Sequence, residues 1–402
     1  MRQPEDLLNP RHYDRVRQEP LEAETLPSWC YTSQEWFDLE VKHIFMKSWN
    51  LIGRVDRVPN PGDFITLTYT GVPVIVTRGR DDVVRAFANT CRHRGAMLLE
   101  GEGNCKAAIK CPYHGWVYGL DGALQGAPEM EETKNFDRAD YGLIPVRLET
   151  WGGFMFINFD DKAPALKDWL GEIHGMIAPW DPENLVCTRR REFELKCNWK
   201  LYVENFNDVG HIKTVHKESL QKLSEKYEKP SQYEAREAEG FTFFSYHAGT
   251  RTLLDGIDKV KGFDPIPATV QGRGREGSFY PTIMPLACFG FCIDSAWALE
   301  MYPLGPDRMK LVVNSCFHKD ALKHPEFERI AQMYYHRMDI AVPEDNAINE
   351  LMQRGLGSPQ ALPGRIGKLE TAVTVMNTWW LDRVLGPSTQ PRAKKEADVR
   401  AA

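Results

Sequence analysis

Apolar positions change their spacing twice along this chain of 402 residues. Residues 1–26 are polar and predict an extended arm, whereas helical spacing over 31–45 predicts a helix that starts at a Thr or Ser. After a Pro- and Gly-rich turn the spacing becomes two, which predicts short strands at 63–69, 74–78 and 83–88. An apolar segment at 153–159 closes this antiparallel β unit, and we expect a domain boundary near residue 160.

Beyond that boundary, helices and strands occur in separate runs. Helices are expected at about 199–218 and 322–355, and strands at 241–246, 296–302 and 309–318. Separate runs predict an α+β fold rather than alternating βαβ units. We therefore expect four segments: an N-terminal arm and helix at 1–39, a β domain at 40–160, an α+β domain at 161–386 and a mobile tail at 387–402.

Two short motifs in the β domain combine cysteine with histidine. Cys91-x-His93 is followed, after seventeen intervening residues, by Cys111-x-x-His114. Two thiolates and two imidazoles are the ligand set of a Rieske [2Fe–2S] centre, in which histidines replace two cysteines on one iron. Zinc could use the same residues, but zinc fingers place a Cys pair before a His pair. Here each loop offers one of each, which favours the cluster, and Cys105 between the loops is not needed as a ligand.

A second metal motif lies near mid-chain. Two histidines and one distant carboxylate hold the iron of non-haem oxygenases and leave positions open for dioxygen, and His211 and His216 fit the histidine pair. Glu204, Asp208 and His211 are spaced so that one helix would project all three from a single face. His216 falls about 140° further round an ideal helix. We therefore expect the helix to loosen or end there, with Gly210 contributing.

The third iron ligand is expected in the segment 341–356. Pro343 suits the first turn of a helix and would place Glu344 and Asp345 at its start. Either acid could simply favour the positive end of the helix dipole. Either could also be held rigidly enough to bind iron, so the pattern leaves both open.

Together these residues resemble the oxygenase α component of the Rieske non-haem iron oxygenases, also called ring-hydroxylating oxygenases. The resemblance runs from about residue 29 to about residue 385. It rests on Cys-Arg-His-Arg-Gly at 91–95, Tyr-His-Gly-Trp at 113–116, Asn-Trp-Lys at 198–200 and the Glu-Asp…Gln-Arg-Gly-Leu segment at 344–356. It implies a Rieske domain followed by a catalytic domain with a large antiparallel sheet around a long helix.

The resemblance also implies roles for individual residues. The cluster ligands would be Cys91, His93, Cys111 and His114, and the iron ligands His211, His216 and Asp345. Asp208 matches the acid that links the iron of one subunit to the Rieske centre of its neighbour. Asn205 matches a position close to the iron in some members.

The same resemblance implies partners and cofactors. The chain would use a Rieske [2Fe–2S] cluster, a mononuclear Fe(II), dioxygen and a small organic substrate. The Gly-rich stretch 272–277 does not follow a convincing strand in a βαβ unit, so no dinucleotide fingerprint is present. Electrons would then come from NAD(P)H through a separate reductase or ferredoxin. We expect a head-to-tail homotrimer, with or without a β subunit.

Hydroxylation of a small aromatic compound is the first expectation, and oxidative N- or O-demethylation, including that of a quaternary amine, is the alternative. Family members that act on quaternary amines usually have Glu at the bridging position and Cys after the first iron histidine. This chain has Asp208 and Ile212 instead, which favours the aromatic substrate. An electron carrier would not need the second metal motif, and the Cys and His order disfavours a zinc-stabilised binding module.

Composition narrows the remaining classes. A hydrophobic content of 42% and a charged content of 26% are ordinary for a globular protein. A net charge of −6 without any basic run argues against a nucleic-acid role. The longest strongly apolar run, 283–293, is too short to span a bilayer, and the polar N-terminus predicts no signal peptide. We therefore expect a cytoplasmic protein without a membrane role.

Overall fold

The computed structural model describes residues 3–217, 219–220, 232–235, 239–246, 262–263 and 272–387. The chain divides into two compact units, one of residues 47–163 and one of residues 1–46 together with 164–402. The N-terminal segment expected to stand apart at 1–39 is thus part of the larger unit. Apart from its first residue, the tail expected at 387–402 lies outside the described residues.

The smaller unit is built on a seven-stranded antiparallel sheet with the order β1-β10-β9-β4-β3-β2-β5. The strands predicted from period-two spacing appear here as β2, β3 and β4. A separate three-stranded sheet, β6-β7-β8, lies beyond β5 in the chain. The strands of this unit are β1 Asn50–Arg54, β2 Asp63–Tyr69, β3 Val72–Arg78, β4 Val84–Ala88, β5 Glu102–Asn104, β6 Ala108–Lys110, β7 Val117–Gly119, β8 Leu124–Gly126, β9 Pro145–Trp151 and β10 Phe154–Asn158.

The larger unit contains a second seven-stranded antiparallel sheet, in the order β11-β17-β16-β15-β14-β13-β12. The apolar run at 283–293 supplies β15, which is buried along its whole length. None of the helices in the described part of the chain combines the length and hydropathy of a bilayer-spanning segment. The strands are β11 Leu185–Leu195, β12 Gln232–Ala235, β13 Gly240–Tyr246, β14 Gly277–Ile283, β15 Ala287–Phe291, β16 Ala296–Gly305 and β17 Arg308–His318.

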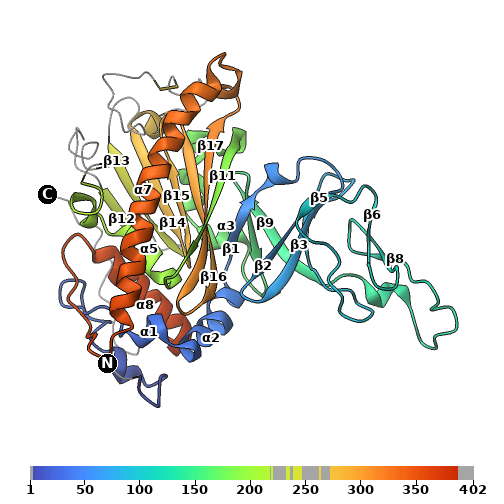
Figure 1. Cartoon of the computed structure of the whole chain (residues 1–402), viewed down its shortest axis with the longest axis horizontal. Helices are drawn as coiled ribbons and strands as arrows, with labels where there is room; N and C mark the ends of the chain where they lie inside the picture. The colour runs from blue at the N-terminus through green and yellow to red at the C-terminus, as the bar shows by residue number, and fades with distance from the viewer. Residues whose placement is uncertain are drawn as a thin grey trace. The chain divides into compact units, whose positions relative to one another are not determined.

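Helices α5 and α7 lie against one face of this sheet and α8 packs on α5, and α7 runs along the sheet as the longest element of the described chain (Figure 1). The sheet with its long helix confirms the predicted α+β class. The helices are α1 Trp29–Thr32, α2 Gln34–His43, α3 Leu166–Leu170, α4 Ile173–Met176, α5 Trp199–Asn207, α7 Phe327–Leu356 and α8 Thr371–Leu385.

The expectation that Pro343 begins a helix is wrong. Helix α7 is continuous over 30 residues and carries Pro343 in its interior. Proline there removes one backbone hydrogen bond and crowds the preceding turn. Burial of Ala341, Val342, Asn349 and Gln353 on the side that packs inward opposes that cost. Glu344 and Asp345 therefore lie in the middle of a helix and not at its positive end.

A buried ion pair ties the N-terminal helices to α5. The Glu40 carboxylate in α2 pairs with the Lys200 ammonium in α5, and both side chains are at most 1% exposed. The indole N–H groups of Trp36 and Trp199 also donate to Glu40, each at 2.8 Å. A buried charge is tolerated only when it is paired and hydrogen-bonded in this way. This cluster explains why residues 29–43 belong to the larger unit.

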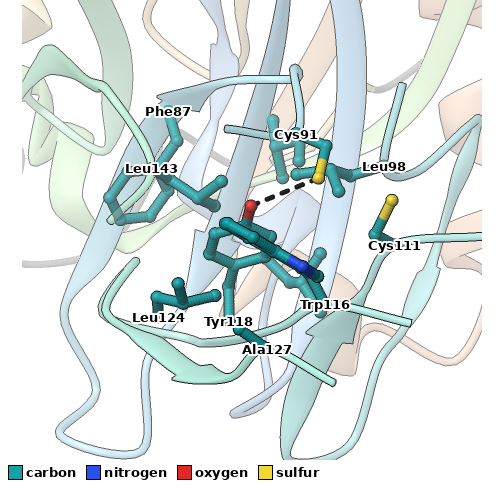
Figure 2. Close-up of a cluster of buried hydrophobic side chains, with 11 residues drawn as sticks. Phe87, Cys91, Leu98, Cys111, Trp116, Tyr118, Leu124, Ala127 and Leu143 are labelled. Carbon is teal, nitrogen blue, oxygen red and sulfur yellow. Dashed lines mark hydrogen bonds between the residues drawn. The ribbon is translucent and has the colours of Figure 1, made fainter. Parts of the chain in front are cut away.

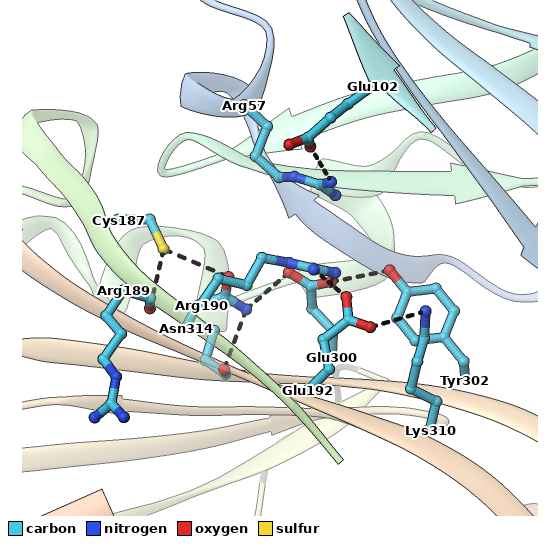
Figure 3. Close-up of polar contacts among 11 residues, drawn as sticks. Arg57, Glu102, Cys187, Arg189, Arg190, Glu192, Glu300, Tyr302, Lys310 and Asn314 are labelled. Atoms are coloured by element: carbon cyan, nitrogen blue, oxygen red, sulfur yellow. Dashed lines mark hydrogen bonds and ion pairs between the residues drawn. The ribbon is translucent and has the colours of Figure 1, made fainter. Parts of the chain in front are cut away.

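A second buried carboxylate lies in the sheet itself. Glu300 in β16 is fully buried and accepts hydrogen bonds from Tyr302 at 2.9 Å and Asn314 at 2.7 Å, while Arg190 in β11 pairs with it at 3.4 Å (Figure 3). These contacts join three neighbouring strands, β11, β17 and β16, through one acid.

Candidate active site

The two Cys and His loops of the smaller unit have the same backbone geometry. The N–H of Gly95 donates to the carbonyl of Cys91 at 2.9 Å, and the N–H of Gly115 donates to that of Cys111 at 3.2 Å. The cysteine N–H groups donate in turn to Ala96 at 2.8 Å and Trp116 at 2.7 Å. Both glycines have a positive φ, near 74°, which a side chain would make costly. The same backbone turn thus occurs twice, at residues 91–96 and at residues 111–116.

A buried apolar cluster supports both cysteines (Figure 2). Cys91 and Cys111 are 3% and 2% exposed, and Trp116 and Tyr118 pack beneath them. The Tyr118 hydroxyl lies 3.3 Å from Cys91 Sγ and accepts the backbone N–H of Arg92 at 3.0 Å. It can therefore donate to a thiolate at this position, and such hydrogen bonds tune the reduction potential of an iron–sulfur centre.

The two histidines of these loops lie close together. The rings of His93 and His114 are 4.6 Å apart between centroids, and His93 stacks on Trp116 at 4.9 Å. Burial, followed by the charges of His114 and Arg94, lowers the pKa of His93 and favours its neutral form, the form that binds metal. His93 Nδ1 is buried and lacks a hydrogen-bond partner among the described residues. These features fit a cluster ligand set drawn from Cys91, His93, Cys111 and His114.

In the larger unit, α5 ends earlier than expected. The helix stops at Asn207, and Asp208 is extended at φ −92° and ψ 106°. Asp208 Oδ1 accepts the N–H of Gly210 at 2.6 Å, a local bond that competes with continued helix. Glu204 accepts a hydrogen bond from Tyr31 at 2.7 Å. The expectation that Glu204, Asp208 and His211 share one helical face is therefore wrong.

The early end of α5 places His211 in a short 3-10 turn, His211–Lys213. His211 Nδ1 faces Asp208, with the backbone carbonyl in hydrogen-bond contact and the carboxylate Oδ2 at 3.7 Å. Its Nε2 lies 3.5 Å from Asp345 Oδ1. The ring is thus held at one nitrogen and directed toward the acid of α7 with the other.

His216 completes the group from the opposite side. Its Nε2 lies 2.9 Å from the same Asp345 oxygen, and its Nδ1 lies 2.7 Å from Glu344 Oε2. The two imidazoles are 5.1 Å apart between centroids. One donor atom from each of His211, His216 and Asp345 falls within 4.8 Å of the others. These three residues, predicted as a set from sequence and resemblance, are brought together.

This arrangement fits a divalent cation. If each imidazole gives its Nδ1 proton to a neighbouring acceptor, both Nε2 lone pairs and the carboxylate of Asp345 converge with no donor between them. Burial lowers the pKa of His211, but hydrogen bonds and charges of Asp208 and Asp345 outweigh it and raise that pKa to about 9. The same negative potential attracts a metal ion, which would displace the proton.

The remaining predicted site residues have clear positions. Asn205 lies buried in the last turn of α5. Glu344, one of the two acids that the pattern left open, contacts Nδ1 of His216 while Asp345 faces the Nε2 atoms. Sequence reasoning missed that contact because it depends on the fold. Cys105 donates to the Gly62 carbonyl at 3.2 Å, as a structural thiol would.

Comparisons with known proteins agree with this geometry. The Rieske [2Fe-2S] domain family matches residues 48–137, and the ring hydroxylating alpha subunit (catalytic domain) family matches residues 182–386. The glycine betaine monooxygenase oxygenase subunit of Pseudomonas aeruginosa is 29% identical over 391 residues, covering 90% of this chain and 89% of that protein. Chloroplastic choline monooxygenase of Beta vulgaris is 30% identical over 378 residues, covering 90% and 77%.

A solved structure shows the same fold. The crystal structure of a quaternary ammonium Rieske monooxygenase in complex with L-carnitine superposes with a TM-score of 0.76 at 23% identity, covering 92% of this chain and 98% of that one. The chain therefore belongs to the Rieske non-haem iron oxygenases as an oxygenase α component, with a [2Fe–2S] Rieske cluster and a mononuclear iron as its cofactors.

Proposed function

We propose that this chain oxidises a small quaternary ammonium compound at a carbon beside the nitrogen, with dioxygen and electrons from a separate reductase. The proposed substrate class rests on two relatives whose alignments cover 90% of this chain. They are a glycine betaine monooxygenase oxygenase subunit and a choline monooxygenase. Both named substrates contain a permanently charged, methylated nitrogen. Hydroxylation of a methyl group on the nitrogen, followed by cleavage of that C–N bond, would give an N-demethylated amine and formaldehyde.

We assign the cofactor ligands that the family resemblance implies. Cys91, His93, Cys111 and His114 hold the cluster, and His211, His216 and Asp345 hold the iron. When bound, iron with three protein donors keeps positions open for dioxygen, and the cluster delivers electrons one at a time. The protein side chains orient these ligands: Asp208 faces Nδ1 of His211, and Tyr118 lies beside the Cys91 sulfur.

Electrons enter from outside the chain in this proposal. The stretch at 272–277 forms a 3-10 turn, Gly272–Arg275, that leads into β14. A dinucleotide site needs the reverse order, a strand running into a helix through the Gly-rich turn. A reductase or ferredoxin that draws on NAD(P)H is therefore the expected donor.

We propose that a group of aromatic rings near the end of α5 contacts the cationic substrate. Phe206, two residues before Asp208, packs edge to face on Trp297 at 5.7 Å between centroids. Tyr280 lies 6.1 Å from the same indole. Trp297 lies so close to Gly290 that a Cβ there would fall 2.3 Å from the ring. A quaternary ammonium donates no hydrogen bond, and aromatic faces are the groups that attract it.

A single-turnover assay tests the proposal without a cognate reductase. The protein is reduced chemically, freed of excess reductant and mixed with dioxygen and one candidate: choline, glycine betaine, carnitine or naphthalene. We expect an oxygenated or demethylated product, detected by mass spectrometry, from a quaternary ammonium compound. Product from naphthalene, with none from the three amines, would contradict the proposed substrate class.

The aromatic group has its own test. Trp297→Leu should raise KM for the cationic substrate by about 2- to 30-fold, because a cation–π contact contributes ~0.5–2 kcal/mol. Trp297→Phe keeps an aromatic ring and should raise KM by a smaller factor than Trp297→Leu. Equal losses in both variants, or loss of kcat alone, would show that the indole does not bind the cation.

One observation favours the aromatic alternative. Asp208 and Ile212 depart from the pattern that the family's amine-oxidising members usually share, as noted from the sequence. The same assay decides between the two classes, because naphthalene is one of its arms.

A further inference from the structure

Glu344 contacts His216, which is the histidine of the proposed iron site that lies away from Asp208. Its Oε2 lies 2.7 Å from His216 Nδ1 and accepts the Ser219 hydroxyl at 2.6 Å. His216 is 1% exposed and Ser219 4%, while the Glu344 side chain is 27% exposed, so both contacts are partly shielded from water. Inside the protein, a shielded charge-assisted hydrogen bond is stronger than its surface counterpart.

The helix explains how adjacent residues reach both nitrogens of one ring. Because α7 is continuous through Pro343, Glu344 and Asp345 are consecutive helical residues that point about 100° apart. Asp345 meets Nε2 of His216, and Glu344 meets Nδ1. The imidazole is therefore held at both edges by neighbouring acids of the same helix.

We infer that Glu344 is a positioning residue of the iron site, which accepts the Nδ1 proton of His216 and so fixes the tautomer whose Nε2 faces the metal. The inference rests on the proposed role of His216 as an iron ligand. A carboxylate on the far nitrogen also makes a metal-bound imidazole a stronger donor. At His211, Nδ1 contacts the Asp208 backbone carbonyl and the Asp208 carboxylate lies at 3.7 Å, so His216 is the histidine whose Nδ1 has a carboxylate within hydrogen-bond distance.

Ser219 extends this arrangement by one residue. Its hydroxyl and the His216 ring converge on the same Glu344 oxygen. The hydroxyl therefore limits rotation of the carboxylate and keeps that oxygen directed at Nδ1.

Metal affinity gives the first test. Mononuclear iron is removed from the full-length protein with a chelator, the cluster is kept, and Fe(II) is titrated back anaerobically. Glu344→Ala should raise the Fe(II) Kd by about 10- to 100-fold. Glu344→Gln retains an acceptor oxygen but no charge, so its Kd should lie between the Kd of the wild type and that of Glu344→Ala. Glu328→Ala removes an exposed acid near the start of the same helix and should leave the Kd unchanged.

Spectroscopy of the Co(II)-substituted protein separates positioning from general structural damage. In the wild type, the Nδ1 proton of each metal-bound histidine should give a shifted NMR signal that exchanges slowly with water. Glu344→Ala should abolish or broaden one of the two signals and leave the other. The visible spectrum of the Rieske cluster reports whether the variant has folded.

The outcomes distinguish the inference from the proposed function. If His216→Ala binds Fe(II) as tightly as the wild type, the ligand assignment itself fails. If His216→Ala loses the metal but Glu344→Ala binds it normally with both proton signals retained, only the positioning role of Glu344 is overturned. A loss in Glu344→Gln equal to that in Glu344→Ala would mean that the charge, and not the hydrogen bond, acts on the site.

Discussion

Cys111 offers the most direct single-residue test of the cluster. Alanine cannot replace a thiolate bond to iron. Cys111→Ala should therefore lose iron, acid-labile sulfide and the visible absorption of the cluster at the same time. Cys105→Ala is the matched control, because that thiol lies in the same unit and only donates to a backbone carbonyl. A normal cluster spectrum in Cys111→Ala would remove this residue from the ligand set.

Glu204 makes stability depend on pH. Burial is the largest influence on its carboxyl and raises the pKa to about 7. A raised folded-state pKa contributes stability that is complete below the unfolded value, near 4.5, and is lost as pH rises through 7. The loss is roughly 3 kcal/mol for a shift of this size.

Glu204→Gln should remove that dependence. The amide keeps an oxygen for the Tyr31 hydroxyl but carries no charge at any pH. We expect the variant to melt at a higher temperature than the wild type at pH 8 and at nearly the same temperature at pH 4.5. The difference between the melting temperatures of variant and wild type at each pH cancels the titrating groups that both proteins share. A difference that stays constant across the pH range would contradict the assignment.

At the scale of single residues, the sequence indicated which side chains the fold brings together but not the contacts that support them. The Cys and His spacings are local and survive folding, so the two loops could be recognised directly. Ser219 gave no signal, because its contact with Glu344 depends on where α7 lies. Choosing between Glu344 and Asp345 likewise required the helix orientation, and the resemblance, not the pattern, favoured Asp345.

At the scale of elements, Arg190 and Glu300 show what a buried charge costs when its partner is removed. Arg190→Met leaves the fully buried Glu300 with Tyr302 and Asn314 as its donors in the described part of the chain. Breaking a buried pair costs about 3–5 kcal/mol, so the melting temperature should fall by several degrees. The measurement is a thermal scan of the cluster-loaded protein.

A neighbouring arginine supplies the control. Arg191 pairs with Asp339 but its side chain is 42% exposed, and exposed pairs contribute about 0–1 kcal/mol. Arg191→Met should therefore change the melting temperature little. Adding Glu300→Gln to Arg190→Met should recover part of the loss; no recovery would mean that the arginine stabilises the sheet by packing alone.

Elements were predictable where their pattern is local. Strand β2 was expected at 63–69 and is found there, since alternating side chains and flanking turn residues define it. Strand β11 was missed because it lies at the edge of its sheet and carries three consecutive arginines. The continuity of α7 through Pro343 was also missed. Packing against the rest of the unit decides both features, and no sequence window contains that information.

At the scale of the whole molecule, Asp208 tests electron transfer between subunits in the proposed homotrimer. Asp208→Asn keeps an oxygen for the Gly210 N–H but loses the charge next to His211. We expect the variant to bind both metals and to assemble, yet to pass electrons from reduced cluster to iron very slowly in single turnover. Fast transfer, or a fully active monomer, would contradict an inter-subunit route.

The larger unit is interrupted in the chain by the smaller one, and this sets an order on synthesis. A ribosome finishes residues 47–163, including both Cys and His loops, while α1 and α2 still lack the helices α7 and α8 that they pack against. Glu40 precedes its partner Lys200 by 160 residues, an interval of roughly 10–30 s at ~5–20 residues per second. Throughout that time the faces of α1 and α2 that pack on α7 and α8 remain uncovered, which leaves this helical pair open to a chaperone on the nascent chain.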